Sequence, residues 1–470
     1  MGQTVDVAIL GGGNGGYAAA LRAAQLGLDV ALVEQDKVGG TCLHRGCIPT
    51  KALLHSAETI ENIRKAETVG VLVDEPKVDW AKVLSYKSSV VDRLYKGLQG
   101  VIKARKVSVV SGRGRLSSPT TIDVEGAETI TAKAIVLASG SYARSLPFIE
   151  IDGQAFITSD HALELPDVPA SAIVIGAGAV GLEFASVWRS FRAEVTVIEA
   201  LPRLAPGEDE EVSKEVTRHF TKRGIKSVVG VKVISAERSG DSASITFEDS
   251  AGKSQTLSAQ VCLVAVGRGP SSEGLGYEEA GVKIDRGFVV VDANCRTGVP
   301  GVWAVGDLIT QPDLGLPFPH FQLAHVAFAE GVNIAEQIAG IATTPINYTG
   351  VPRCTYSIPE IASVGLTEQQ AKDAGHETRT AKFPWAASGK ATILGETAGF
   401  VKVVASKDGP VLGVHMVGPH VTELIAEAQM ITNWDAYPED VATLFHPHPT
   451  LSEALGESML HLAGKQLHGA

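Results

Sequence analysis

The chain has 470 residues, of which 44% are apolar and 20% are charged, a composition typical of globular proteins. At roughly 150 residues per domain this length predicts two to four domains and excludes a single small binding module. Its 41 Lys and Arg residues against 53 Asp and Glu residues give a formal net charge of −12, which argues against a protein that binds nucleic acid or an anionic membrane.

The N-terminal residues run directly into an apolar, strand-like segment. They lack the basic region and apolar stretch of a signal peptide, and Asp6 stands where a myristoylation site needs Ser or Thr. No stretch reaches the ~18 uninterrupted apolar residues of a membrane span. Five cysteines are too few, and odd in number, for a secreted disulfide framework. We therefore expect a cytoplasmic protein without a membrane span.

The first predicted unit covers residues 5–35 and has the order apolar strand, glycine turn, helix, apolar strand, acid. Its turn is a G-x-G-x-x-G motif made of Gly11, Gly13 and Gly16, and Glu34 is the acid. In such a unit the first glycine allows the tight turn, the second lets the backbone approach a pyrophosphate, and the third allows close packing of helix on strand. The helix N-terminus can bind the phosphates, and the acid can accept hydrogen bonds from ribose hydroxyls.

Two cysteines follow this unit in the segment GGTCLHRGCIPTK, residues 39–51. On an ideal helix the Cα atoms of Cys42 and Cys47 would lie roughly 8 to 9 Å apart, whereas a disulfide needs about 4.4 to 6.8 Å. A bond between them therefore requires a distorted first turn, for which Gly46 and Pro49 are suited. A strained bond near a helix N-terminus would be easy to reduce.

The spacing of these two cysteines leaves three interpretations open. They can be a redox pair, half of a zinc site completed by His44 or His55, or two unpaired core cysteines. No second cysteine pair with metal-ligand spacing follows along the chain, and we expect no metal. The remaining cysteines are expected to be small buried apolar residues: Cys262, Cys295 and Cys354.

Residues 172–200 repeat the design of the first unit, with Gly176, Gly178 and Gly181 in the turn and Glu199 as the acid. In both units the acid lies 23 residues after the first glycine (34 − 11 and 199 − 176). A lone motif is often only a glycine-rich turn, but two motifs in the same setting, each with its acid, predict two dinucleotide sites. The acid favours a free ribose 2′-hydroxyl over a 2′-phosphate.

Further apolar segments flank the two units. Residues 134–141 and 261–268 are expected to form buried strands that end in glycine. Residues 297–307 are expected to form another strand, with Asp307 just past its end, where the carboxylate can reach a bound polyol or, alternatively, cap a helix. From residue 351 onward, strand-like segments and an amphipathic helix predict a third, α+β domain.

Near the C-terminus the segment LFHPHPTLSEALGE contains His446, His448 and Glu453. A carboxylate bonded to one ring nitrogen of a histidine fixes its tautomer and raises its basicity. His448 and Glu453 can form such a pair if the intervening turn folds back, and the His-Pro peptide permits a cis bond that would aim the ring. The alternative is a polar surface loop with incidental histidines.

Taken together, the two glycine units, the segment GGTCLHRGCIPTK, the strand ending in AVGD and the segment HPHPTLSE resemble the pyridine nucleotide–disulfide oxidoreductases, and most closely the members that oxidise dihydrolipoamide. The resemblance covers essentially the whole chain. It implies an α/β fold with two Rossmann-like dinucleotide-binding domains and a C-terminal α+β dimerisation domain. We accordingly expect an FAD-binding domain in residues 1–150, an NAD-binding domain in 151–282, a second FAD or central segment in 283–350 and an interface domain in 351–470.

The same resemblance implies the activity and its residues. Cys42 and Cys47 would form a redox disulfide, with Cys42 facing substrate and Cys47 facing the flavin, and His448, oriented by Glu453, would be the acid–base. The implied reaction is flavin-dependent oxidation of dihydrolipoamide with reduction of NAD+; the alternative is a reductase of another low-molecular-weight disulfide that uses NADH or NADPH. Glu183 would pair with Lys51 beside the flavin and nicotinamide.

The other implied contacts form two sets. Those with FAD are Gly11, Gly13, Gly16, Glu34, Gly40, Thr41, Lys51, Gly114, Ser139, Gly140, Ser141, Asp307 on the ribitol, Gln322, Leu323, Ala324 and His325. Those with NAD are Gly176, Gly178, Gly181, Glu199 and Gly267.

The resemblance also implies partners: a homodimer with shared active sites, and lipoyl domains of 2-oxoacid dehydrogenase complexes or the lipoyl protein of glycine cleavage. A non-catalytic scaffold is disfavoured, because it would not need both cysteines, the histidine and its carboxylate. The chain departs from the family at His44 and Arg45, where Asn and Val are common, and in a Pro-rich loop at residues 311–319 that is longer than usual.

Overall fold

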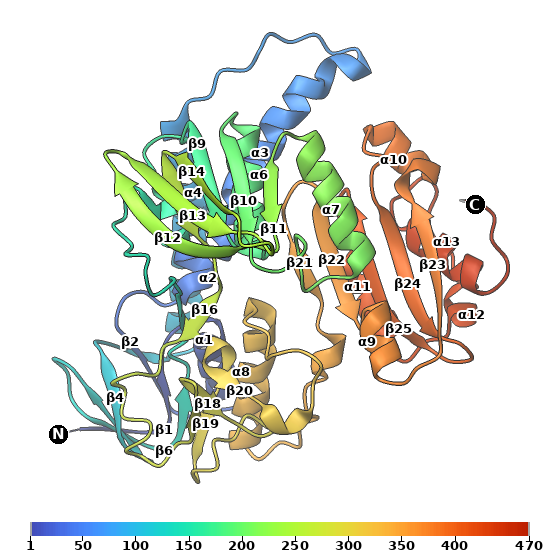
Figure 1. Cartoon of the computed structure of the whole chain (residues 1–470). Coiled ribbons are helices and arrows are strands. Elements are labelled where there is room, and N and C mark those ends of the chain that lie inside the picture. Colours follow the sequence, from blue (N-terminus) through green and yellow to red (C-terminus); the bar gives the residue numbers. More distant parts are fainter. Residues whose placement is uncertain (1, 469–470) are drawn as a thin grey trace. The chain divides into compact units, whose positions relative to one another are not determined.

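A computed structural model describes residues 2–468, which fall into two compact units (Figure 1). The first unit comprises Met1–Ala52, Lys82–Arg144 and Gly267–Tyr348, and the second comprises Leu53–Ala81, Ser145–Val266 and Thr349–Ala470. The four domain segments expected above stay a prediction. Within the described residues, no helix has the length and apolar character that crossing a bilayer demands.

A seven-stranded sheet forms the centre of the first unit. The strands that carry the first glycine unit run parallel, as do their direct neighbours, and an antiparallel pair extends one edge. In spatial order the strands are β3 (Ser108–Ser111), β2 (Val30–Glu34), β1 (Gln3–Leu10), β6 (Ile130–Leu137), β5 (Thr121–Val124) and β4 (Gly114–Ser118), with β19 (Val302–Ala304) also paired to β6.

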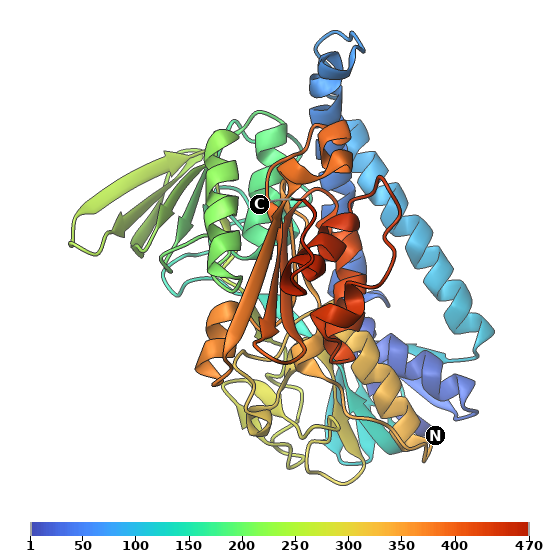
Figure 2. The ribbon, with the colours of Figure 1, turned by 90° about the vertical axis from the view of Figure 1, so that its right-hand side faces the viewer.

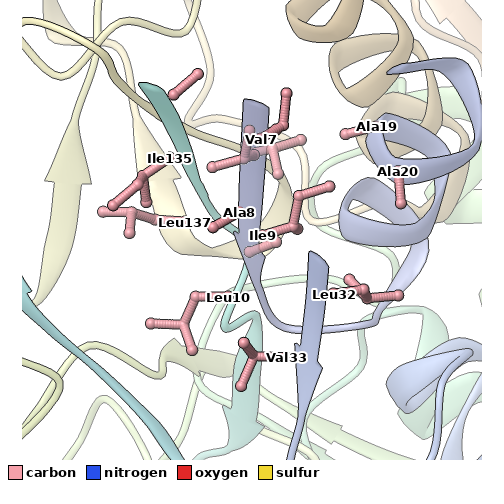
Figure 3. Packing of buried hydrophobic residues seen from close by; sticks show 14 of the residues in the cluster. Val7, Ala8, Ile9, Leu10, Ala19, Ala20, Leu32, Val33, Ile135 and Leu137 are labelled. Atoms are coloured by element: carbon pink, nitrogen blue, oxygen red, sulfur yellow. The ribbon is translucent and has the colours of Figure 1, made fainter. Parts of the chain in front are cut away.

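The core of this unit explains why these segments are strands. The last four residues of β1 are all buried, as expected for a central parallel strand that is covered on both faces. Figure 3 shows Ile9 and Leu10 of β1 beside Leu32 and Val33 of β2, with Leu137 of β6 on the other side. This apolar packing holds the carboxyl ends of the strands, where the glycine turn begins.

Two helices pack side by side next to this sheet, α1 (Asn14–Gln25) and α8 (Ala324–Ile338) (Figures 1 and 2). Their approach depends on a glycine: an ideal Cβ at Gly331 of α8 would lie 2.4 Å from the carbonyl oxygen of Gly15 in α1. Further helices of the chain are α2 (Gly40–Arg45), α3 (Cys47–Lys65), which passes from the first unit into the second, and α4 (Trp80–Ala104).

The second unit contains a five-stranded parallel sheet built on the second glycine unit. The helix α6 (Ala179–Ser190) follows its central strand. In spatial order the strands are β11 (Lys226–Val229), β10 (Glu194–Glu199), β9 (Ser171–Ile175), β15 (Val261–Val264) and β8 (Phe156–Ile157), and β12 (Lys232–Ser239), β13 (Ser242–Glu248) and β14 (Ser254–Ala259) form a separate antiparallel sheet.

The same unit holds the C-terminal α+β part of the chain. Two helices, α11 (Val421–Asn433) and α13 (Glu453–Leu462), cover one face of an antiparallel sheet (Figure 2). Its strands, in spatial order, are β21 (Arg353–Thr355), β22 (Glu360–Gly365), β25 (Val411–Gly418), β24 (Phe400–Ser406) and β23 (Thr378–Pro384). The predicted fold class, two Rossmann-like parts and a C-terminal α+β part, is thus confirmed.

Candidate active site

The first glycine turn joins β1 to α1 in the geometry that a dinucleotide requires. Gly11 has φ +111°, and a Cβ there would lie 2.2 Å from the carbonyl oxygen of Ala138. A Cβ at Gly16 would lie 1.9 Å from the carbonyl oxygen of Gly11, so the backbone excludes any side chain at both positions. A Cβ at Gly13 would meet nothing within 4 Å, which leaves room for a ligand against the backbone.

The second glycine turn, between β9 and α6, repeats this geometry. Gly176 has φ +105°, and a Cβ there would lie 2.3 Å from the carbonyl oxygen of Ala265. A Cβ at Gly181 would lie 2.0 Å from the carbonyl oxygen of Gly176, whereas a Cβ at Gly178 would meet nothing within 4 Å. Each of the three positions therefore has the same local environment in both units.

Both helices that follow these turns have N-termini suited to an anion. Gly13 and Gly178 are the N-cap residues of α1 and α6, and neither helix has a side-chain cap or an acidic residue in its first turn. The first backbone N–H groups of a helix lack intrahelical acceptors, and phosphate is a favoured partner for them. The chain's own residues thus fit a pyrophosphate at each turn.

The two acids are held in place by matching hydrogen bonds. Glu34 accepts the N–H of Gly12 and the N–H of Asp36, both at 2.8 Å. In the second unit the carboxylate of Glu199 accepts two backbone N–H groups in the same way, from Ala177 at 2.7 Å and Leu201 at 2.8 Å. Since a carboxylate has about four acceptor positions, each acid can still accept from ribose hydroxyls. The internal repeat therefore extends to individual hydrogen bonds.

The two cysteines lie on either side of a break between α2 and α3. Gly46, between the helices, has φ −145° and ψ −110°, far from helical values, and its carbonyl oxygen accepts the Thr50 hydroxyl at 2.6 Å. The break brings the sulfurs of Cys42 and Cys47 into hydrogen-bonding contact, with both residues present as thiols. The distorted turn predicted at Gly46 is thus confirmed, and it makes close approach of the two sulfurs possible.

The surroundings of Cys42 determine how tightly its thiol holds the proton. The hydrogen bond to Cys47 contributes most to raising the pKa of Cys42 well above its usual range, followed by burial and by repulsion from a charge on Cys47. A hydrogen bond from Asn14 and the charge of Lys51 oppose this rise only in part. The Cys42 thiol therefore holds its proton more tightly than an exposed thiol does.

Two further residues near the thiols were not predicted from the sequence. Asn14 is the first residue of α1, and Tyr17 lies one turn later on the same helix. Burial, together with repulsion from a charge on Cys42, raises the pKa of Tyr17 to about 12, so its hydroxyl stays protonated at neutral pH. The i, i+3 spacing of these two polar residues on a predicted helix was the available signal.

The two residues expected to depart from the family pattern, His44 and Arg45, lie in α2 together with Cys42. The ring nitrogen Nε2 of His44 lies 3.0 Å from the carbonyl oxygen of Val38, and the ring packs edge-on against Tyr95 with centroids 4.9 Å apart. Arg45 is exposed and makes a loose ion pair with Asp36 at 3.8 Å. Among residues 2–468, no group of three or more His, Cys, Asp and Glu side chains is arranged to hold a metal ion.

Asp307 lies in a short 3₁₀ turn (Gly306–Leu308) directly after β19 and its neighbouring residue. Its carboxylate accepts the hydroxyl of Ser141 at 2.5 Å and lies 3.6 Å from Nε of Arg268. The N-cap of the turn is Val305, so the alternative that Asp307 caps a helix is wrong. The side chain of Gln322 donates to the carbonyl oxygen of Asp307 at 3.2 Å.

Other predicted flavin contacts cluster around the same strand ends. The hydroxyl of Ser139 donates to the carbonyl oxygen of Ser271 at 2.6 Å and accepts from Tyr277 at 2.9 Å. A Cβ at Gly40 would lie 2.7 Å from Cα of Gly13, so α2 touches the glycine turn directly. The rest lie in the first unit at strand or helix ends: Thr41 in α2, Lys51 in α3, Gly114 at the start of β4, Gly140 after β6, and Leu323, Ala324 and His325 at the start of α8.

Near the C-terminus the turn between His448 and α13 folds back. The ring nitrogen Nδ1 of His448 lies 2.8 Å from Oε1 of Glu453, and the other oxygen of that carboxylate accepts the Thr450 N–H at 2.8 Å. Although burial opposes it, these hydrogen bonds lower the pKa of Glu453 below its ordinary value. The His448–Pro449 peptide is cis, and the side chain of His448 is 78% exposed.

A second histidine–carboxylate pair lies beside the first. Nε2 of His446 lies 2.7 Å from Oε1 of Glu427, and this hydrogen bond raises the pKa of His446. The ring of His446 packs on Gly456, where a Cβ would lie 2.5 Å from Nδ1. Of the two histidines, His446 is the less accessible, with 12% of its side chain exposed.

Some predicted groupings join residues of different units. Lys51 belongs to the first unit and Glu183 to the second, and likewise the cysteine pair belongs to the first and His448 to the second. Within the second unit, Glu183 is buried and accepts the N–H of Tyr356 at 3.0 Å. The pairing of Lys51 with Glu183 stays a prediction, as does the approach of His448 to a cysteine pair.

Gly267, which follows β15, has φ +97° and open space at its Cβ position.

Comparison with known proteins adds relatives over the full length. The model of the family described as pyridine nucleotide-disulphide oxidoreductase matches residues 5–331, and the model of that family's dimerisation domain matches residues 351–459. Dihydrolipoyl dehydrogenase of Bacillus subtilis is 44% identical and that of Cupriavidus necator 41% identical, each with 100% of both chains covered. The crystal structure of LpdA from Mycobacterium tuberculosis superposes with a TM-score of 0.88 at 26% identity, covering 98% of this chain and 99% of that one.

Proposed function

Because the chain belongs to the pyridine nucleotide–disulphide oxidoreductase family, we propose that it is an enzyme that oxidises dihydrolipoyl groups to lipoyl groups and reduces NAD+ to NADH, with FAD as its resident cofactor. The observation that carries the proposal is the contact between the thiols of Cys42 and Cys47 across the helix break at Gly46. Relatives named dihydrolipoyl dehydrogenase that match over the full length support it.

The thiol chemistry follows from this pair. In the oxidised enzyme, a substrate thiolate attacks the sulfur of Cys42, which breaks the Cys42–Cys47 bond and leaves Cys47 as a thiolate. The second substrate thiol then displaces Cys42 and closes the lipoyl disulfide, so that the substrate has lost two electrons and the cysteine pair has gained them. The hydrogen-bonding contact between the two sulfurs places Cys47 next to Cys42, as the sulfur that leaves in the first step.

The histidine pair supplies the proton transfer in this proposal. Nε2 of His448 takes the proton of the substrate thiol, and Glu453 orients the ring through Nδ1 at 2.8 Å. Because a carboxylate only accepts hydrogen bonds, Nδ1 carries the proton and Nε2 is left basic. His448 acts on the cysteine pair of the partner subunit, which makes each active site shared.

The two glycine turns would hold the two dinucleotides. The first turn, with Gly11, Gly13, Gly16 and Glu34, would bind the ADP part of FAD, and Asp307 would bind the ribitol. FAD, when bound, would accept the electron pair of the reduced cysteines and transfer it as hydride to NAD+. The remaining residues proposed for the two cofactors are Gly40, Thr41, Lys51, Gly114, Ser139, Gly140, Ser141, Gln322, Leu323, Ala324 and His325 for FAD, and Gly176, Gly178, Gly181, Glu183, Glu199 and Gly267 for NAD+.

The assembly in this proposal is a homodimer formed through residues 351–470. The match to a dimerisation domain supports it, and so do large exposed apolar side chains there, among them Phe445 (100% exposed) and Trp434 (76%), since exposed apolar patches often mark protein interfaces. The proposed protein partners are lipoyl domains of 2-oxoacid dehydrogenase complexes or the lipoyl protein of glycine cleavage. A cytoplasmic location stays a prediction.

Replacement of one thiol tests the proposed reaction. Cys42→Ser should abolish dihydrolipoamide turnover while FAD stays bound, because the serine hydroxyl cannot form the mixed disulfide. The matched control is Cys354→Ser. This cysteine lies outside the pair and is half-buried, so the prediction that it is buried is wrong; the variant should retain turnover. Flavin absorbance reports the bound cofactor, and NADH formation reports turnover. Full activity of Cys42→Ser would reject the disulfide mechanism.

A further inference from the structure

A buried carboxylate on α8, Glu330, has no part in the chemistry proposed above. Its side chain is 0% exposed. Oε2 accepts the backbone N–H of Gly306 at 2.7 Å, and Oε1 lies 2.7 Å from Nε2 of His320 and accepts the hydroxyl of Tyr348 at 2.8 Å. A charge in such a place is stable only when its hydrogen-bonding positions are filled, so this arrangement depends on all three donors.

The first of these donors leads directly to the proposed flavin site. Gly306, with φ +77°, precedes Asp307 in the 3₁₀ turn after β19. Hydrogen bonds from N–H groups to a charged carboxylate are stronger than neutral ones, and this one anchors the peptide that carries Asp307. The Asp307 side chain in turn accepts from Ser141 at 2.5 Å and lies 3.6 Å from Arg268. Glu330 therefore fixes the backbone from which Asp307 reaches its partners.

The second donor connects the Pro-rich loop to the same carboxylate. His320 ends that loop, and its side chain is 4% exposed. Since the carboxylate of Glu330 only accepts, Nε2 of His320 carries the proton in this contact. The ring packs edge-on against Tyr348, with centroids 5.5 Å apart. At the other end of the loop the side chain of Gln311 donates to the carbonyl oxygen of Asp292 at 3.1 Å, so both ends are tied down.

We propose that Glu330 is a positioning residue for the flavin site. Its carboxylate holds Asp307 in place through the N–H of Gly306. Through the same carboxylate, His320 couples the loop at residues 311–319 to the retention of FAD. The inference rests on the proposed function only in that Asp307 contacts FAD. It assigns a role to the Pro-rich loop at residues 311–319.

The effect of removing the charge follows from the donors around it. Glu330→Gln preserves the size of the side chain but replaces one acceptor oxygen with an NH₂ donor, so one of the three donors faces another donor. Losing a hydrogen bond to a charged group weakens an interaction by roughly 10- to 100-fold. We expect the Kd of FAD to rise by about that factor. His320→Ala should raise it in the same direction, because Glu330 then lacks one donor and the loop end is released.

A double-mutant cycle tests whether Glu330 acts through Asp307. Full-length holoprotein is diluted in steps, and the released FAD is measured by its fluorescence for wild type, Glu330→Gln, Asp307→Asn and the double variant. If Glu330 positions Asp307, Glu330→Gln weakens FAD binding in the wild-type background and has much less effect in the Asp307→Asn background. Fully additive effects would show that Glu330 only supports the fold and would overturn the proposal.

Two further variants complete the test. Should Glu330→Gln fail to fold, the same cycle with His320→Ala takes its place, because His320 ends a loop outside the sheet, and additivity there would equally overturn the proposal. Asp313→Asn removes an exposed carboxylate from the same loop and should leave the Kd of FAD unchanged. If Asp313→Asn raised the Kd of FAD as much as His320→Ala does, the specific role of His320 would be refuted. The cycle uses no thiol substrate, so a protein that retains FAD but does not oxidise dihydrolipoamide would reject the proposed reaction and leave this result intact.

Discussion

The second glycine turn offers a substitution that should separate cofactor binding from folding. Gly178 is the N-cap of α6, with φ −79° and ψ −176°, an extended conformation that alanine adopts without strain. A Cβ there meets no protein atom within 4 Å. Gly178→Ala should therefore fold normally, while its methyl group occupies the space in which a pyrophosphate would approach the backbone.

The expected change in the free energy of unfolding is small because two effects oppose each other. Replacing glycine by alanine where the backbone allows it stabilises a protein by about 0.4 to 1 kcal/mol through the unfolded chain. Alanine is a poorer N-cap than glycine, which costs about as much. The Kd of NAD+, in contrast, should rise at least about tenfold, equivalent to about 1.4 kcal/mol.

Gly181→Ala in the same motif gives the opposite pattern. Its Cβ would lie 2.0 Å from the carbonyl oxygen of Gly176, and neither backbone segment can move without separating α6 from β9. We expect a loss of about 1 to 3 kcal/mol or more in unfolding free energy, as for an overpacked core. Gly207→Ala is the matched control, since Gly207 is exposed in the same unit and a Cβ there also meets nothing within 4 Å.

Two measurements on the full-length, FAD-loaded protein distinguish these variants: urea unfolding, and titration with NAD+ followed by flavin fluorescence. Wild-type NAD+ affinity in Gly178→Ala would refute the assignment of this turn to NAD+. If Gly178→Ala lost as much unfolding free energy as Gly181→Ala, the inference that a methyl group fits at Gly178 would be refuted.

The remaining predictions concern the proposed proton transfer and the ion cluster around Lys402. His448→Gln should lower kcat for dihydrolipoamide by about 10²- to 10⁴-fold, and Glu453→Gln, which leaves the base in place but unoriented, should lower it less; a near-normal rate in His448→Gln would reassign the base. Lys402 is buried and lies 2.8 Å from Glu368 and 3.1 Å from Asp209. Lys402→Met should cost about 3 to 5 kcal/mol of unfolding free energy, because it leaves the buried carboxylate of Asp209 without this cation, whereas Glu368 keeps its ion pair with Lys372. A loss no larger than that of an exposed Lys→Met change would contradict this. Hydrogen bonds from Lys372 and Lys402 lower the pKa of Glu368 from its ordinary 4.5 to about 2. As the pH falls, the carboxyl group is therefore protonated in the unfolded chain before it is protonated in the folded protein, so the contribution of Glu368 to stability should be complete above about pH 4.5 and lost as the pH falls toward 2. Urea unfolding of wild type and Glu368→Gln across that range measures this contribution, and equal pH dependence of the two proteins would refute the prediction.

The parts of the fold that could be predicted are those set by local spacing. The two glycine turns depend on residues within one strand–helix connection, so the positions of Gly11 and Gly176 in the sequence already imply their positive φ angles. The break at Gly46 was predictable only under the redox-pair interpretation, because a contact between Cys42 and Cys47 is incompatible with an ideal helix.

The contacts that could not be predicted join residues far apart in the chain. The carboxylate of Glu330 binds Gly306, His320 and Tyr348, which come from a turn, a loop and a helix end with no common spacing. The ion pair of Asp307 with Arg268 likewise forms only when the ends of different strands meet. For Asp307 the sequence therefore allowed two roles, a helix cap or a contact with a ligand, and only the folded structure excluded the helix cap.

Anaerobic reduction of the FAD-loaded protein by dihydrolipoamide tests the central claim most directly. The account predicts that one equivalent of substrate produces a long-wavelength absorption band from the Cys47 thiolate next to the flavin, and that NAD+ then removes the band with formation of one NADH, whereas NADP+ does not. Absence of the band, or discharge by NADP+ in preference to NAD+, would contradict the account and favour a reductase of another disulfide.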